Sequence, residues 1–94
     1  MAPIWSARAK RDLRAIGAYI AKDNSSAAAT MVKRIAAAAE HLSEHPMIGH
    51  AGRVADTREL IVAGTSYILV YRAGNRGVRI VAVMHASREW PDSF

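Results

Sequence analysis

Arginines and a histidine stand at the ends of three strand-like runs late in the chain, and these residue types could do chemistry on an anion. Arg58 lies at the start of the first run, and His85 ends the third. An arginine fork can hold a phosphate or a carboxylate through two hydrogen bonds. A histidine can act as a general acid or base near neutral pH. The simpler alternatives are a surface ion pair between Arg58 and Glu59 and a hydrogen-bonded structural role for His85.

A basic concavity is expected if these runs form a curved sheet. Four further arginines would then lie near Arg58: Arg53, Arg72, Arg79 and Arg88. Such a surface fits a nucleic acid or an acidic protein partner. Trp90 is either a packing anchor for the C-terminal tail or a ring that stacks on a base.

Two histidines four residues apart, His41 and His45, could chelate a metal from one helix, with Glu44 and His50 nearby. The simpler interpretation is that both favour the negative end of the helix dipole, and no carboxylate is clearly aimed at them apart from Glu44, which lies on a neighbouring part of the helix surface. We therefore expect no metal site and no cofactor. The sequence also has no P-loop, dinucleotide glycine fingerprint, nucleophile elbow or HExxH motif.

The composition indicates one small basic domain over residues 1–94, with a net charge of +5. The positive charge favours anionic partners. The absence of cysteine excludes disulfides and thiolate metal sites. No apolar run approaches the roughly 20 residues that a membrane span needs, so we expect a cytoplasmic protein without membrane contact.

The elements that must position these residues are two helices followed by strands. Ser6 is expected to cap the first helix. Its apolar stripe consists of Ala9, Leu13, Ile16 and Ile20. A break at residues 23–26 leads into a second helix, which Pro46 ends. So short a connection predicts an antiparallel helical hairpin.

Strands are predicted over residues 57–62, 67–72 and 78–85, with a short edge strand at residues 3–5. Simple alternation puts Val78, Ile80, Ala82 and Met84 on one face of the last strand and His85 on the other. The fold class is therefore α+β, with an N-terminal helical hairpin packed on a small antiparallel sheet.

Nearly the whole chain resembles the RelE/ParE family of small bacterial toxins from type II toxin–antitoxin systems. The resemblance rests on three stretches in order: Trp5 through Ile20, Leu42 through Leu60 with Thr57-Arg58-Glu59-Leu60, and Tyr67 through Pro91 with Val70-Tyr71-Arg72, His85, Arg88 and Trp90-Pro91. It implies two helices packed on a small antiparallel sheet.

This resemblance implies two alternative activities. RelE-like members are ribosome-dependent endoribonucleases that cut mRNA, and in that case Arg58 and Arg72 would hold the phosphate beside His85 as general acid or base. ParE-like members poison DNA gyrase. No tyrosine follows Tyr71, so the C-terminal catalytic tyrosine is missing and the ending looks closer to the ParE branch. The residues then expected to bind the target are Arg58, Arg72, His85, Arg88 and Trp90.

A cognate antitoxin in a hetero-oligomeric complex is the partner that the resemblance implies in either case. Its acidic tail is expected to lie across the helical hairpin and the sheet. The residues expected to bind it are Leu13, Ile16, Arg53 and Arg79. A third alternative is an inactive homologue that is kept as a transcriptional co-repressor with its antitoxin.

Overall fold

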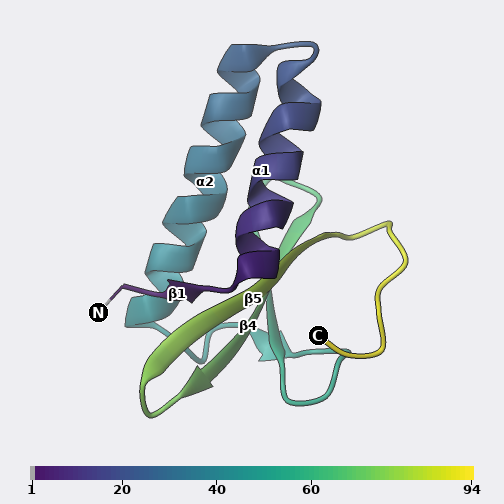
Figure 1. Ribbon diagram of the computed structural model, residues 1–94. Helices are drawn as coiled ribbons and strands as arrows, with labels where there is room; N and C mark the ends of the chain where they lie inside the picture. The colour runs from purple at the N-terminus through teal and green to yellow at the C-terminus, as the bar shows by residue number, and fades with distance from the viewer. Residues whose placement is uncertain (1) are drawn as a thin grey trace.

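Two helices form the first half of the chain, and each begins at a residue whose side chain caps it. The computed structural model describes residues 2–94, with α1 at Ala7–Ala21 and α2 at Ser25–Glu44. Ser6 Oγ accepts a hydrogen bond from the Ala9 N–H at 3.0 Å, and Asn24 Oδ1 accepts one from the Ala27 N–H at 2.9 Å. Residues 22–24 join the helices into the predicted antiparallel hairpin (Figure 1).

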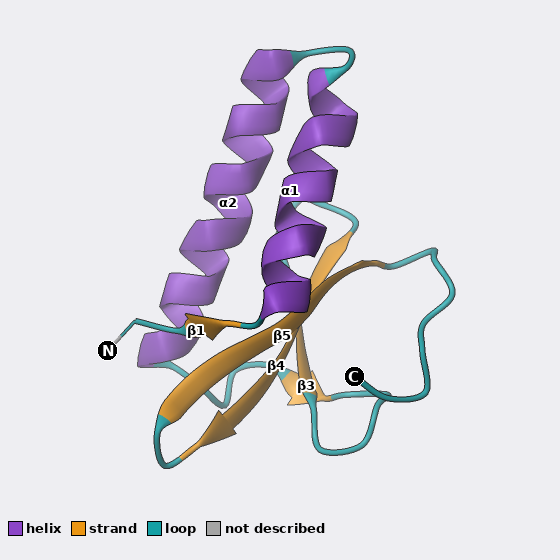
Figure 2. Cartoon of the chain, in the orientation of Figure 1, coloured by secondary structure: helices purple, strands orange, loops and turns teal. Residues whose placement is uncertain are grey.

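A five-stranded sheet lies against one side of this hairpin, in the order β1-β5-β4-β3-β2 (Figure 2). The strands are β1 (Ile4–Trp5), β2 (His50–Ala51), β3 (Arg58–Ile61), β4 (Tyr67–Gly74) and β5 (Gly77–His85). The predicted α+β fold is confirmed. The expected edge strand β1 pairs in parallel with β5, so the sheet is mixed rather than wholly antiparallel.

A β-bulge interrupts the pairing of β4 with β5. Val70 is opposite Ala82, but the next residue along β4, Tyr71, is opposite Ile80, which leaves Val81 without a counterpart. An extra residue in one strand moves every later side chain of that strand to the other face. The faces predicted by simple alternation are therefore wrong beyond Ile80.

The consequence for the site is a change in the position of His85. Ile80 and Val83 both pack into the core under the helices, whereas Ala82 and Met84 belong to a second cluster on the outer face. His85 is opposite Tyr67 and contacts its ring edge-on at a centroid distance of 5.4 Å. It therefore shares the helix-facing side with Ile80 instead of opposing it.

The protein has two apolar clusters, one on each face of the sheet. The main core lies between the helices and the sheet and contains fully buried Ile35, Leu42, Leu69 and Tyr71. On the outer face, Val70, Ala82 and Met84 are covered by Trp90 and Phe94 of the C-terminal segment. Within residues 2–94, no helix is long and apolar enough to cross a membrane.

Candidate functional site

Arg58 holds the turn after α2 against the sheet. It lies opposite Tyr71 on the helix-facing side, and its Nη2 donates hydrogen bonds to the carbonyl oxygens of Met47, at 3.2 Å, and Gly49. Tyr71 Oη donates to the Pro46 carbonyl at 2.8 Å and accepts from the Gly49 N–H at 3.0 Å. The Nη2 group of Arg58 is therefore already hydrogen-bonded to the protein's own backbone.

The buried carboxylate of Glu59 pairs with Arg53, whose side chain is 49% exposed, so the ion pair between Arg58 and Glu59 that the sequence left open is not the one that forms. The Glu59 carboxylate is 2% exposed and accepts hydrogen bonds from the Arg53 N–H at 2.7 Å and from Arg53 Nε and Nη2 at 3.2 Å. His50 Nε2 lies 3.5 Å from the same carboxylate. Burial alone would raise the pKa of the Glu59 carboxyl, but the hydrogen bonds and charge of Arg53, with His50, outweigh it and lower the pKa.

Trp90 anchors the C-terminal segment over this ion pair. The Arg53 guanidinium carbon lies 3.6 Å from the centre of the Trp90 ring, a cation–π contact. Trp90 Nε1 donates a hydrogen bond to the His85 carbonyl at 3.3 Å. Farther along, Arg8 stacks over Phe94 at 4.9 Å. The packing role is thus the one that the geometry of Trp90 supports, because its ring is already covered by Arg53.

A pocket of about 640 Å³ opens between α1, the end of β5 and the segment that follows. Residues that line it include Asp12, Ile16, Tyr19, Tyr67, His85 and Arg88. His85 Nδ1 is held by Ser87, whose N–H lies at 3.1 Å and whose Oγ lies at 2.7 Å. Ile16 is half-buried in this pocket and Tyr19 is 67% exposed. The pocket therefore combines an apolar wall from α1 with the cationic or polar groups of His85 and Arg88.

Asp12 and Arg8 contribute to the same region and were not identified from the sequence. Asp12 Oδ2 accepts a hydrogen bond from the Val83 N–H at 3.0 Å and lies 3.6 Å from Arg8 Nε. It thereby provides a hydrogen-bond acceptor for a backbone N–H on the part of the β5 edge that β1 does not cover. The signal in the sequence was one acidic residue within a basic helix, but its backbone partner lies 71 positions away in the chain.

The predicted site residues do not converge on one concavity. Arg58 and His85 lie on the same side of the sheet, opposite Tyr71 and Tyr67. At a rise of roughly 3.3 Å per residue, those two positions along β4 are roughly 13 Å apart. Arg72 alternates with Tyr71 and so lies on the outer face.

The residues expected to meet the antitoxin are also dispersed. Leu13 and Ile16 are both half-buried and both pack against the main core, and Ile16 also lines the pocket. Arg53 is engaged by Glu59 and Trp90. Arg79 is exposed and lies directly opposite Arg72 across β4 and β5.

Comparison with known proteins shows similarity to toxins along nearly the whole chain. Residues 4–90 match the family model of the ParE toxin of the type II toxin–antitoxin system parDE. The chain is 49% identical over 87 residues to the putative toxin Y4kP of Sinorhizobium fredii, covering 93% of this chain and 90% of that protein. It is 38% identical over 85 residues to the toxin RelE2 of Caulobacter vibrioides, covering 90% and 94% of the two chains.

A solved structure has the same fold. A chain of the chromosomal ParDE system from P. aeruginosa superimposes with a TM-score of 0.80, and the match covers 93% of this chain and 97% of that one. The sequence identity is 20%, so the likeness concerns the fold alone.

Proposed function

We propose that this chain, which belongs to the ParE toxin family of type II toxin–antitoxin systems, acts by binding and poisoning DNA gyrase rather than by cutting RNA. Membership of the family implies a cognate antitoxin as a partner. The proposed activity is that of a protein-binding inhibitor: it traps gyrase on cleaved DNA and blocks replication.

The observation that carries the proposal is the separation of the residues that a ribonuclease would need together. Phosphate-holding arginines and a general acid or base must meet around one phosphate. Here Arg58 is held by backbone carbonyls and lies roughly 13 Å along the sheet from His85, and Arg72 lies on the outer face. The absence of any tyrosine after Tyr71 points in the same direction.

The arginines best placed to meet a target are those whose side chains form no hydrogen bond or ion pair within residues 2–94. Arg88 is exposed at the rim of the pocket. Arg72 and Arg79 face each other as a cross-strand pair, and like charges directly opposite each other destabilise a sheet. An acidic or phosphate-bearing partner would relieve that repulsion. Arg58 and Trp90, in contrast, stabilise the protein's own turn and tail, so a change at either would alter the fold as well as binding.

We further propose that the acidic, apolar tail of the antitoxin occupies the pocket. Ile16 and the exposed Tyr19 would contact its apolar side chains, while Arg88 would pair with its carboxylates. An antitoxin truncated before this tail should fail to neutralise the toxin. Equal neutralisation by the truncated and full-length antitoxins would contradict the proposal.

The alternative is a ribosome-dependent mRNA endoribonuclease, which is kept because one relative bears the name toxin RelE2. In that case His85→Gln should abolish mRNA cleavage, since the ring would carry the proton. The gyrase proposal requires no proton transfer, and the same variant should still inhibit gyrase.

Expression without antitoxin in bacterial cells separates the two activities. The proposal predicts that a reporter plasmid loses negative supercoils and accumulates protein-linked breaks, while mRNA ends mapped by primer extension stay intact. Arg88→Ala should weaken growth arrest, whereas Arg34→Ala, a change of an exposed arginine on α2 that removes the same charge, should not. Early mRNA cleavage with normal supercoiling would instead identify the ribonuclease.

A further inference from the structure

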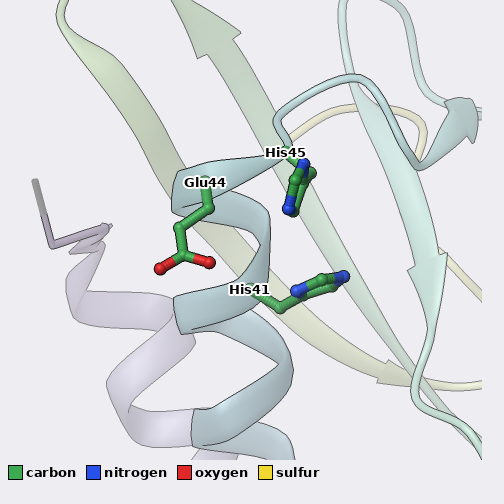
Figure 3. Close-up of side chains that lie close together, drawn as sticks. All are labelled: His41, Glu44 and His45. Atoms are coloured by element: carbon green, nitrogen blue, oxygen red, sulfur yellow. The ribbon is translucent and has the colours of Figure 1, made fainter.

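The last turn of α2 and the residue that caps it bring together three side chains that can bind a metal: His41, Glu44 and His45. Each offers one ligand atom, and these three atoms lie within 4.8 Å of one another. Figure 3 shows the two imidazoles one above the other on the same side of the helix, and their ring centroids are 4.9 Å apart. The sequence alone led us to expect no metal site, but from this geometry we propose that these three residues bind a divalent transition-metal ion such as Zn²⁺.

The separations are close to those that such an ion requires. Zinc binds nitrogen and oxygen ligands at about 2.0–2.2 Å, which puts tetrahedral ligand atoms roughly 3.4 Å apart. All three side chains are exposed. Rotation about their own bonds can therefore close the remaining gap, including that of the Glu44 carboxylate, which points away from the rings in this view.

The helix itself explains why a cation is favoured at this position. The carboxyl end of a helix carries partial negative charge, so a negatively charged Glu44 in its last turn is unfavourable there. Histidines alone would suit the helix dipole, but that explanation does not account for Glu44. A bound divalent cation offsets both the carboxylate and the helix end.

The ligand set identifies the class of ion. Two imidazoles and one carboxylate suit zinc, nickel, cobalt or copper, whereas magnesium and calcium prefer oxygen ligands alone. His50 is already 3.5 Å from the Glu59 carboxylate and belongs to a different cluster. The fourth position is therefore left to water or to a partner's side chain.

Binding should stiffen the end of α2 and the turn that follows. The His45 N–H donates to the His41 carbonyl at 3.0 Å, so a metal bridging the two rings would clamp the same helical turn. The next residues, 46–49, form the turn held by Arg58 and Tyr71. The ion thus stabilises the helix end beside that turn through its three coordination bonds, and it catalyses no reaction.

Titration of the full-length, tag-free protein with Zn²⁺ tests the proposal. We expect one ion per chain, with affinity at least roughly tenfold weaker, or about 1.4 kcal/mol, in His41→Gln and in His45→Gln. Glu44→Gln should weaken binding less than either histidine change. The controls are His50→Gln and His85→Gln, which remove the other two histidines and should leave zinc affinity unchanged.

Two further readouts make the test independent of toxicity. Zn²⁺ should raise the melting temperature of the wild type more than that of His41→Gln at the same zinc concentration, because stabilisation by a ligand of the folded state falls as its affinity falls. Co²⁺ should give visible absorption bands that disappear in both histidine variants. Wild-type zinc affinity in His41→Gln and His45→Gln would overturn the proposal, and wild-type affinity in Glu44→Gln would overturn the three-ligand site.

Discussion

Replacement of Glu59 by glutamine tests whether the buried ion pair holds the loop before β3 and the C-terminal segment together. Glu59 is 2% exposed and its carboxylate accepts the Arg53 N–H at 2.7 Å together with two guanidinium bonds at 3.2 Å. Glutamine has nearly the same shape but no charge. The variant therefore removes the negative charge and one of the two acceptor oxygens without leaving a large cavity.

The expected loss of stability is about 2 kcal/mol near neutral pH. A hydrogen bond to a charged group contributes about 1.5–3 kcal/mol. The Arg53 side chain is 49% exposed, so solvent screens its part of the interaction and the lower half of that range applies. For a domain of this size, about 2 kcal/mol corresponds to a fall in Tm of roughly 8–16 °C.

The stability difference between wild type and Glu59→Gln should also depend on pH. The pKa of Glu59 is lower in the folded protein than the usual value of 4.5. The stability from its charge is therefore fully present above the unfolded pKa and is lost as pH falls through the lower folded pKa. The difference should be full near neutrality and should shrink in acid below the unfolded value.

Urea unfolding at several pH values measures this difference directly. Glu40→Gln is a matched control, because it removes an exposed carboxylate from α2 and should change stability little. The double variant Arg53→Gln/Glu59→Gln should be less destabilised than the sum of the two single changes. A Glu59→Gln protein as stable as the wild type near neutrality, or a difference that persists unchanged in acid, would refute this reasoning.

Three further substitutions test the packing around the site, each by urea unfolding. Tyr71→Phe removes the phenol that bonds Pro46 and Gly49, and should cost about 1–3 kcal/mol; wild-type stability would contradict these bonds. Gly49→Ala should cost about 1–3 kcal/mol, because its new Cβ would lie 2.5 Å from Tyr71 Oη and 2.7 Å from the Glu59 carbonyl oxygen. Trp90→Ala should cost about 2 kcal/mol, roughly half the value for a fully buried ring, and should expose the C-terminal segment to proteases, whereas an equally resistant segment would argue against the anchor.

Local signals explain why the helices and strands could be predicted. Ser6 and the break at residues 23–26 mark the starts of the two helices through side-chain caps, and Pro46 marks the end of the second. These signals act within one turn of the chain, so they are visible without tertiary structure.

The bulge in β5 could not be predicted, because the strand is apolar on both sides. Val81, Ala82, Val83 and Met84 are all buried, since the helices cover one face and the C-terminal segment covers part of the other. A pattern without polar residues carries no information on register. The position of His85 depends on that register, so the residues that surround it could not be predicted from the sequence.

The site also depends on ion pairs and hydrogen bonds whose partners could not be identified from the sequence. Some partners are distant in the chain, and others are one of several residues of the same type. Glu59 had five nearby arginines as candidates in the expected concavity, and only the loop geometry selects Arg53. Asp12 accepts a hydrogen bond from the Val83 N–H because β1 pairs only with residues 79 and 80 of β5 and leaves this N–H without a strand partner. The charged residues of the site could therefore be named from the sequence, whereas the partner of each one could be identified only from the fold.

A supercoiling assay with purified gyrase tests directly whether this protein poisons gyrase. The toxin, separated from its antitoxin and refolded, is added to gyrase, ATP and relaxed plasmid, and supercoiled and cleaved DNA are measured together. If the protein poisons gyrase, supercoiling should be lost and cleaved DNA should accumulate, both with the wild type and with His85→Gln. Normal supercoiling in the presence of well-folded toxin, with ribosome-dependent mRNA cleavage that His85→Gln abolishes, would contradict it.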